Sequence, residues 1–296
     1  MMNVRPRRSL LYMPATNARA LDKARMLPVD GVILDLEDSV APDAKETARA
    51  AAVAAVKAGG FGGREVFVRI NGLDTPWGID DFTAVAQGAP DAILVPKVSG
   101  PEVLDMLGTR LLDMHAAKSI RLWAMIETPI AILRAPDIAA LSRDSEIRLA
   151  GFVIGTNDLV KEAQGRPVRG RAPLVPWLMQ CLAAARAYGL AIIDGVYNDF
   201  RDLDGFRDEC RQGRDMGFDG KTLIHPSQIE SCNAIFSPDA AEIAEARKII
   251  AAFDAPENAG KGVVQIDGRM VERLHADMAR RTVAIAEAIA DRERQS

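Results

Sequence analysis

The chain has 296 residues, of which 48% are hydrophobic and 26% are charged, with 37 lysines and arginines against 41 aspartates and glutamates. This length allows one large domain or two ordinary ones with a substantial core, and the composition excludes a wholly disordered chain. The formal net charge of -4 argues against nucleic acid or an anionic membrane surface as the main partner.

Cysteine content and apolar runs indicate the compartment. Cys181, Cys210 and Cys232 are odd in number and far apart, which fits neither a disulfide framework nor a zinc site and is typical of a reducing compartment. The apolar run near the N-terminus is short and ends at Pro14, which argues against a signal peptide. No apolar stretch reaches the roughly 18 residues that a membrane span requires. We therefore expect a soluble, cytoplasmic protein.

Short β-branched or aliphatic runs alternate with alanine-rich amphipathic segments. The runs predict eight strands, at residues 9–13, 32–36, 66–70, 92–95, 122–126, 149–154, 191–193 and 222–224. The segments between them predict helices at residues 15–27, 44–57, 78–87, 101–117, 131–142, 174–188 and 203–216. Such alternation indicates βαβ units and a parallel sheet.

Eight units in a chain of this length favour a closed (β/α)8 barrel, and an open doubly wound sheet is the alternative. An open nucleotide-binding sheet usually has a glycine-rich first turn, but this one reads Met-Pro-Ala-Thr-Asn at residues 13–17. Gly220-Lys221-Thr222 ends like a phosphate-binding loop, but Asp215 stands where the leading glycine belongs. We interpret that match as chance.

Two more helices are expected after the eighth strand. Ser237 followed by Pro238 is typical of a helix start, and this helix is predicted to run to about residue 253. Residues 256–262 predict a flexible connection, and a final helix is expected from about Met270, with Leu274 and Met278 on its apolar face. We expect a catalytic barrel at residues 1–253, and at residues 254–296 a linker and helix that act as a lid on a neighbouring subunit.

Catalytic groups of a barrel lie at the carboxyl ends of its strands and in the loops that follow. Every predicted strand after the first ends in ionisable residues, which hydrophobic patterning alone would not produce. In chain order these are Asp35, Glu37 and Asp38, then Arg69, Lys97, Glu127, Asp158, Asp194 and His225.

Glu127 and Asp158 follow adjacent strands, which lie about 5 Å apart, so both could hold one metal ion. Hard oxygen ligands without cysteine or clustered histidine favour Mg²⁺, with Mn²⁺ possible, over zinc. The alternatives are a helix-capping role for Glu127 and a solvated loop acid for Asp158.

Arg69 ends a strand that should be buried. It could form a structural ion pair with Asp35 or Glu37, present a fixed fork to a substrate carboxylate or enolate oxygen, or do both. For Asp35, Glu37 and Asp38 we favour support of neighbouring groups over direct metal binding. Lys97 could bind an anion or lie at the rim, and His225 is expected to brace the loop after the eighth strand.

Six segments resemble one family. They are RRSLLYMP at 7–14, ILDLEDSV at 33–40, VRIN at 68–71, IET at 126–128, GFDGKTLIHPSQ at 217–228 and DGRMVE at 267–272. In this order, over nearly the whole chain, they are similar to the citrate lyase beta-subunit-like group of the HpcH/HpaI aldolase superfamily, relatives of malyl-CoA and citramalyl-CoA lyases.

The resemblance implies a (β/α)8 barrel, Mg²⁺ and chemistry on coenzyme A thioesters. It makes Glu127 and Asp158 the metal ligands and Arg69 the contact for substrate and enolate. It implies a nucleotide over the first βα loop, with Arg19 and Lys23 as phosphate contacts. It further implies a homotrimer or hexamer in which a C-terminal acid of one subunit, Glu272 here, serves proton transfer in the next.

We therefore expect first a Mg²⁺-dependent lyase that cleaves a 3-hydroxyacyl-CoA such as malyl-CoA or citramalyl-CoA to an acyl-CoA and a 2-oxo acid. Asp38 and its acidic neighbours would orient Arg69 and metal-bound water. The family pattern usually has Asp at the position of Glu272, and an acid often precedes the position of Asp158, where Asn157 stands here. The alternatives are a malyl-CoA thioesterase using the same site, an aldolase acting on free 2-oxo acids, and a silent subunit of a multienzyme lyase.

Overall fold

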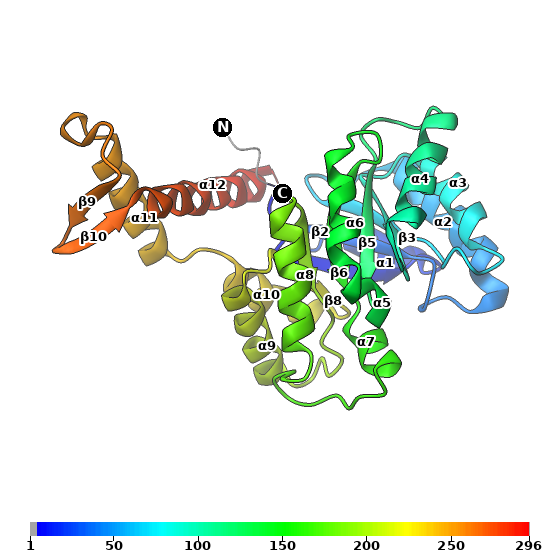
Figure 1. Ribbon diagram of the computed structural model, residues 1–296. Coiled ribbons are helices and arrows are strands. Elements are labelled where there is room, and N and C mark those ends of the chain that lie inside the picture. The colour runs from blue at the N-terminus through cyan, green and yellow to red at the C-terminus, as the bar shows by residue number, and fades with distance from the viewer. Residues whose placement is uncertain (1–4, 296) are drawn as a thin grey trace. The chain divides into compact units, whose positions relative to one another are not determined.

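The centre of the molecule is a closed ring of eight parallel strands (Figure 1), within a computed structural model that describes residues 5–295. Each strand pairs with the next in sequence, and β1 pairs with β8 to close the ring. The predicted (β/α)8 barrel is thus confirmed. The strands are β1 Ser9–Pro14, β2 Gly31–Asp35, β3 Glu65–Arg69, β4 Ala92–Val95, β5 Arg121–Ile126, β6 Leu149–Ile154, β7 Ala191–Asp194 and β8 Gly220–Leu223.

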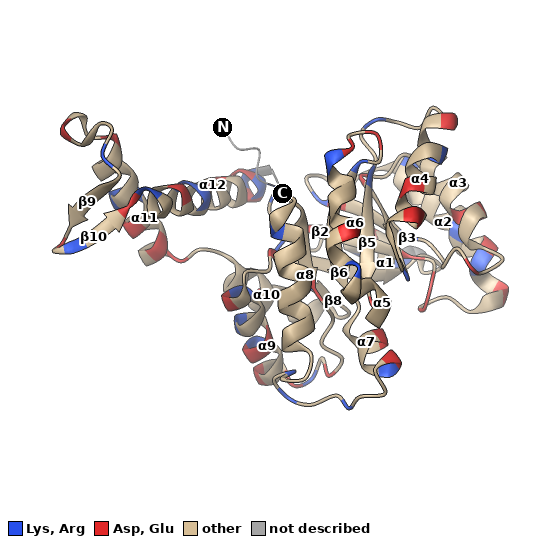
Figure 2. Cartoon of the chain, in the orientation of Figure 1, with Lys and Arg blue, Asp and Glu red and all other residues tan. Residues whose placement is uncertain are grey.

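Helices connect consecutive strands and cover the outside of the ring (Figure 1). Figure 2 shows lysine and arginine interspersed with aspartate and glutamate along these outer helices. Short α7 and α10 were not predicted. The helices are α1 Ala18–Ala24, α2 Lys45–Ala58, α3 Gly78–Gly88, α4 Pro101–Asp113, α5 Pro129–Leu133, α6 Ala135–Ala140, α7 Thr156–Glu162, α8 Val175–Ala187, α9 Leu203–Met216 and α10 Ile229–Phe236.

The single helix predicted at residues 131–142 is wrong, because the chain forms two short helices, α5 and α6, that meet at Arg134. Pro136 in the first turn of α6 has no amide hydrogen, so the carbonyl of Ile132 cannot accept the usual helical bond four residues on. The side chain of Gln180 donates to that carbonyl instead, at 2.9 Å. The proline therefore divides the helix without leaving a buried carbonyl unpaired.

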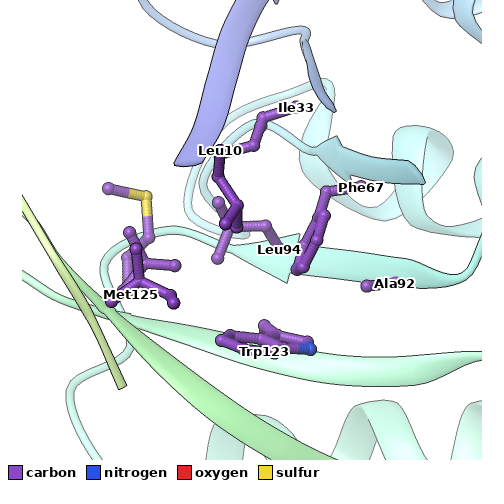
Figure 3. Close-up of a cluster of buried hydrophobic side chains, with 9 residues drawn as sticks. Leu10, Ile33, Phe67, Ala92, Leu94, Trp123 and Met125 are labelled. Atoms are coloured by element: carbon purple, nitrogen blue, oxygen red, sulfur yellow. The ribbon is translucent and has the colours of Figure 1, made fainter. Parts of the chain in front are cut away.

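The interior of the ring is packed with apolar side chains from alternate strand positions, as Figure 3 shows. Phe67 and Trp123 meet edge to face with ring centres 5.1 Å apart, and both are fully buried. Gly151 makes room for this pair, because a Cβ there would lie 2.4 Å from the Trp123 ring. The interior of the barrel is therefore a filled core, and polar groups gather at the carboxyl ends of the strands.

Residues 7–233 form one compact unit, and residues 234–295 together with residues 5–6 form a second, C-terminal unit. The division lies upstream of the boundary expected after residue 253, because α11 (Ala240–Asp254) packs on α12 (Arg273–Gln295). A hairpin of β9 (Val263–Ile266) and β10 (Arg269–Glu272) belongs to the same C-terminal unit. No helix within residues 5–295 is long and apolar enough to cross a membrane.

Three details of the C-terminal unit correct the sequence-based expectations. The N-cap of α11 is Asp239 rather than Ser237, since its carboxylate accepts the amide hydrogen of Glu242 in a capping box. Met270 lies in β10, so the last helix begins at Arg273. Of the predicted apolar face of α12, which also included Ile285 and Ile289, Ile289 is buried, whereas Leu274 and Met278 are exposed. Ala276 and Ala279 are also buried. Small residues at these positions allow the two helices to approach closely.

Candidate active site

Arg69 is the centre of a buried charge cluster at the carboxyl ends of β2 and β3. Its Nε and Nη2 atoms donate to the two carboxylate oxygens of Asp35, each at 2.7 Å. Its Nη1 atom lies 2.8 Å from Glu37 and 3.1 Å from Asp38. The ion pairs considered for Asp35 and Glu37 are therefore both present, and Arg69 contacts three carboxylates at once. Their charges hold the guanidinium in one orientation.

The loop after β2 is built around Asp35. Its carboxylate also accepts the amide hydrogens of Glu37 at 3.0 Å and Ser39 at 3.1 Å. Although burial opposes it, the charge and hydrogen bonds of Arg69 hold the pKa of Asp35 below its ordinary value. Lys45 donates from Nζ to the carbonyl oxygens of Leu36 and Glu37, at 2.9 and 2.7 Å. This loop therefore presents Glu37 and Asp38 in a fixed arrangement.

Glu37 is held differently from Asp35. Burial raises the pKa of Glu37 to about 8, and the carboxylates of Glu127 and Asp38 add to the rise while Arg69 opposes it. The side chain of Glu37 is 10% exposed, whereas that of Asp38 is 67% exposed. Near neutral pH, Glu37 can therefore hold a proton while exposed Asp38 faces solvent.

Glu127 lies directly after β5 and is almost completely buried. Its Oε1 atom accepts the amide hydrogen of Lys97 at 2.6 Å. Burial raises the pKa of Glu127 to about 7, and the nearby carboxylate of Asp158 contributes to the rise. Asp158 stands in the first turn of α7 and is partly exposed. The two residues proposed as metal ligands are thus close enough for their charges to interact.

A cavity of about 280 Å³ opens beside these residues. Tyr12, Arg69 and Asp158 line it, together with the apolar side chains of Met125 and Ile154. Its mixed lining and its place at the strands' carboxyl ends are those expected of a small-molecule site.

Tyr12 and Asn198 line the same cavity but were not predicted. The ring of Tyr12 lies under Arg69, with the guanidinium carbon 4.8 Å from the ring centre. Asn198 exchanges side-chain hydrogen bonds with Asn157, at 2.7 and 3.1 Å. Tyr12 was concealed within the apolar run of the first strand, and Asn198 in a loop without a motif.

Asp158 lines the cavity, whereas Glu127 lies against Gly155 of the lining and is not itself part of it. The donor set at this edge of the cavity fits a hard divalent cation. Glu127 and Asp158 offer carboxylate oxygens, and their mutual repulsion would be relieved by a cation between them. Within residues 5–295 no cluster of three or more His, Cys, Asp or Glu side chains has the arrangement of a metal site. Two protein carboxylates, with water or substrate supplying the other oxygens, is a usual arrangement for Mg²⁺.

Other predicted site residues are not in this cavity. Arg19 and Lys23 lie one turn apart on α1, exposed to solvent and outside the cavity lining. Glu272 is the exposed last residue of β10 in the C-terminal unit. His225 braces the loop after β8, because its Nδ1 atom accepts the amide hydrogen of Ser227.

A second buried charge cluster lies between β7, β8 and α9. Lys221 has no exposed side-chain surface, and its Nζ atom contacts Asp194 at 2.9 Å and Glu209 at 2.7 Å. Arg171, from the segment between α7 and α8, reaches Asp194 at 2.6 Å. The lysine of the apparent phosphate-binding motif is therefore part of an ion-pair network, in keeping with our rejection of that motif.

Comparison with known proteins assigns the family. A family profile described as HpcH/HpaI aldolase/citrate lyase matches residues 8–226. The chain belongs to this family. It is 50% identical over 285 residues to a (3S)-malyl-CoA thioesterase of Cereibacter sphaeroides strain KD131, covering 96% of each chain. It is 35% identical over 295 residues to the citrate lyase subunit beta of Escherichia coli K12, covering 98% of this chain and 96% of the relative.

Structural comparison agrees with the family assignment. The crystal structure of the Mycobacterium tuberculosis protein CitE in complex with magnesium, acetoacetate and coenzyme A is 27% identical, with a TM-score of 0.77. The alignment covers 97% of this chain and all of that one. The resemblance seen in the sequence motifs is thus confirmed at the level of the HpcH/HpaI family, whose named members here are enzymes of coenzyme A thioester or citrate chemistry.

Proposed function

We propose that this protein is a Mg²⁺-dependent thioesterase that hydrolyses malyl-CoA or a closely related 3-hydroxyacyl-CoA. The observation that carries the proposal is that Glu127 and Asp158 lie close together beside a cavity. Arg69 lines this cavity and is held in place by Asp35. The 50% identity to a (3S)-malyl-CoA thioesterase supports hydrolysis as the reaction. This order reverses the sequence-based expectation, which placed carbon–carbon cleavage first.

Glu127 and Asp158 would hold the cation, and Arg69 would position the substrate. Mg²⁺, when bound, supplies a Lewis acid that polarises substrate oxygens and lowers the pKa of a bound water. Arg69 contacts three carboxylates, so its orientation is fixed before substrate arrives. Such a preset donor stabilises charge that develops on a substrate oxygen without further reorganisation.

Asp38 is the carboxylate best placed to accept a proton. It lines the cavity, contacts Arg69 at 3.1 Å and is 67% exposed, so water reaches it. In the proposed reaction, Asp38 takes a proton from water as the water oxygen bonds to the thioester carbonyl carbon. The carbon–sulfur bond then breaks, and the thiolate of coenzyme A leaves and takes the proton back from Asp38. Asp35 and Glu37 keep Arg69 in place throughout.

The second candidate is cleavage of the carbon–carbon bond to an acyl-CoA and a 2-oxo acid. The 35% identity to a citrate lyase subunit beta supports it. In this reaction Arg69 would face the enolate oxygen. Glu272 of a neighbouring subunit would carry the proton to the enolate carbon. Glutamate is one methylene longer than the aspartate usual at this position. If this extra length places the carboxylate nearer the thioester, it would favour hydrolysis instead.

We further propose that Arg19 and Lys23 contact the phosphates of coenzyme A. Both are exposed cations on one face of α1, the helix that follows the first barrel strand. A homotrimer or hexamer in the cytoplasm, with the C-terminal unit as a lid on a neighbouring barrel, completes the proposal. The exposed Met270, Leu274 and Met278 of that unit are apolar enough to support such packing.

A product assay tests the function. Purified protein is incubated with (3S)-malyl-CoA and Mg²⁺, and free thiol, malate, acetyl-CoA and glyoxylate are quantified. Malate with stoichiometric thiol supports the thioesterase, whereas glyoxylate with acetyl-CoA supports the lyase. Glu127→Gln and Asp158→Asn, which keep the side-chain shapes, should each abolish turnover. Near-normal rates in either variant would show that the metal site is assigned wrongly.

A further inference from the structure

Lys97 has an unusual backbone conformation directly beside Glu127. Its φ angle is +51°, in the left-handed region that residues with a side chain rarely adopt. It follows β4 by two residues, and Pro96 precedes it. Such a conformation persists only where surrounding contacts hold it. The contact here is the hydrogen bond from the Lys97 amide to Oε1 of Glu127, at 2.6 Å.

Gly155 lies against the same carboxylate from the opposite neighbouring strand. It follows β6 with an ordinary φ of −97°, so its backbone does not require glycine. Space does require it. A Cβ at Gly155 would lie 2.4 Å from the Cβ and 2.6 Å from the Oε2 of Glu127. Any side chain at this position would therefore displace Glu127.

We propose that Lys97 and Gly155 form a clamp that sets the orientation of the Glu127 carboxylate before a divalent cation binds. Lys97 acts through its peptide N–H, and Gly155 acts through the absence of a Cβ. Both are positioning residues, and the inference rests on the proposed role of Glu127 as a metal ligand. Because β4 and β6 flank β5 in the barrel, Glu127 is held from both sides.

The clamp has a direct energetic consequence for cation binding. A carboxylate that is already oriented loses little conformational freedom when it binds, so the affinity for the cation rises. The hydrogen bond occupies Oε1, and no other donor to Glu127 is present within residues 5–295, so Oε2 is available to a cation. Outer partners of this kind typically contribute a factor of about 10 to 100 to metal affinity.

A series of Lys97 variants separates the peptide from the ammonium group. The ammonium lies among carboxylates, and Glu37 and Asp158 raise the pKa of Lys97 although burial opposes this. Lys97→Gly, Lys97→Ala and Lys97→Val all remove that charge, but their tolerance of a positive φ falls in this order. A role of the charge alone would change all three variants equally. The clamp predicts a graded effect.

The measurement is the dissociation constant for Mn²⁺ of the full-length protein, by calorimetry or electron paramagnetic resonance. We expect Lys97→Val to bind Mn²⁺ at least about tenfold more weakly than Lys97→Gly, with Lys97→Ala between them. Equal constants for the three variants would overturn the clamp. If thermal melting shows that the valine variant is unfolded, the glycine and alanine variants decide, and equality of those two overturns it.

Gly155→Ala tests the other side of the clamp, with Gly262→Ala as its matched control. Gly262 has no atom within 4 Å of an added Cβ. We expect Gly155→Ala to weaken Mn²⁺ binding about tenfold or more and Gly262→Ala to leave it unchanged; equal binding in both refutes the role of Gly155. A different result would refute the metal site itself rather than the clamp. The site is refuted if the unaltered protein binds no Mn²⁺, or if Glu127→Gln binds Mn²⁺ as tightly as the unaltered protein.

Discussion

The buried network around Lys221 gives a sharp prediction for stability. Lys221→Met keeps an unbranched apolar stem of similar length but removes the ammonium that contacts Asp194 and Glu209. Neither Lys221 nor Asp194 has exposed side-chain surface, so water cannot replace the lost partner. Arg171, at 2.6 Å from Asp194 and 3.3 Å from Glu209, remains as a cation facing both carboxylates.

Breaking a buried ion pair by removing one partner costs about 3–5 kcal/mol, because it leaves an uncompensated charge. Since Arg171 remains, we expect a loss of about 3 kcal/mol in the free energy of unfolding. Lys161→Met is the matched control, because Lys161 pairs with Glu162 at 3.7 Å with side chains 73% and 47% exposed. Exposed pairs contribute at most about 1 kcal/mol.

The assay is urea unfolding at pH 7, followed by far-ultraviolet circular dichroism for the unaltered protein and both variants. The reasoning is refuted if Lys221→Met and Lys161→Met differ from each other by less than about 1 kcal/mol. A double variant, Lys221→Met with Glu209→Gln, should recover part of the loss, because it removes one of the two carboxylates left facing Arg171.

Three further predictions concern the active site. The pKa of Glu37 rises from 4.5 to about 8 on folding, so the folded state holds the proton more tightly than the unfolded state. The unfolding free energy of the metal-free protein should therefore fall as the pH rises from 4.5 to 8. This fall should be smaller in Glu37→Gln. Urea titrations at pH 5 and 8 test this, and identical pH slopes would contradict it. Arg69→Lys should lower kcat at least about 100-fold, because a point charge cannot replace the two parallel bonds to Asp35; activity within tenfold would argue against the fork. Arg19→Glu with Lys23→Glu should raise KM for the thioester, with little change in kcat, and the effect should shrink at high salt; an unchanged KM would remove both from the coenzyme A site.

The barrel could be predicted because its signals are local and repeated. Each strand is a short apolar run between helical segments, and eight such units leave few topologies. The deviations come from interactions that a pattern does not contain, such as the Gln180 side chain that completes the division at Pro136. The β9–β10 hairpin did have a signal in the sequence, namely the Asp267-Gly268 pair, since Asp-Gly is typical of hairpin turns. In the structure both residues adopt the positive φ angles of such a turn. We interpreted that segment as a motif and a helix start instead.

The candidate site was predictable in outline for a similar reason. Acids after successive parallel strands must meet at one end of the barrel, which places Glu127 and Asp158 together. The sequence does not contain the conformation of Lys97 or the space that Gly155 leaves, because both depend on how neighbouring strands approach. The Lys97 conformation and the space at Gly155 are set by distances between neighbouring strands. The presence of acids at the strand ends follows from residue type alone.

The charge balance of the site supports the proposal that a divalent cation accompanies an anionic substrate. Five carboxylates and three cations lie close to one another here. The acids are Asp35, Glu37, Asp38, Glu127 and Asp158, and the cations are Lys45, Arg69 and Lys97. Burial raises the pKa of Glu37 to about 8 and that of Glu127 to about 7, so the site reaches its full negative charge only above neutral pH. Arg69 is already engaged by three of the carboxylates. A hydroxyacyl-CoA with a free carboxylate would be repelled by such a site. In the proposed site, a divalent cation held by Glu127 and Asp158 would reverse the local sign where the substrate's oxygens would bind, while the remaining carboxylates keep Arg69 in place.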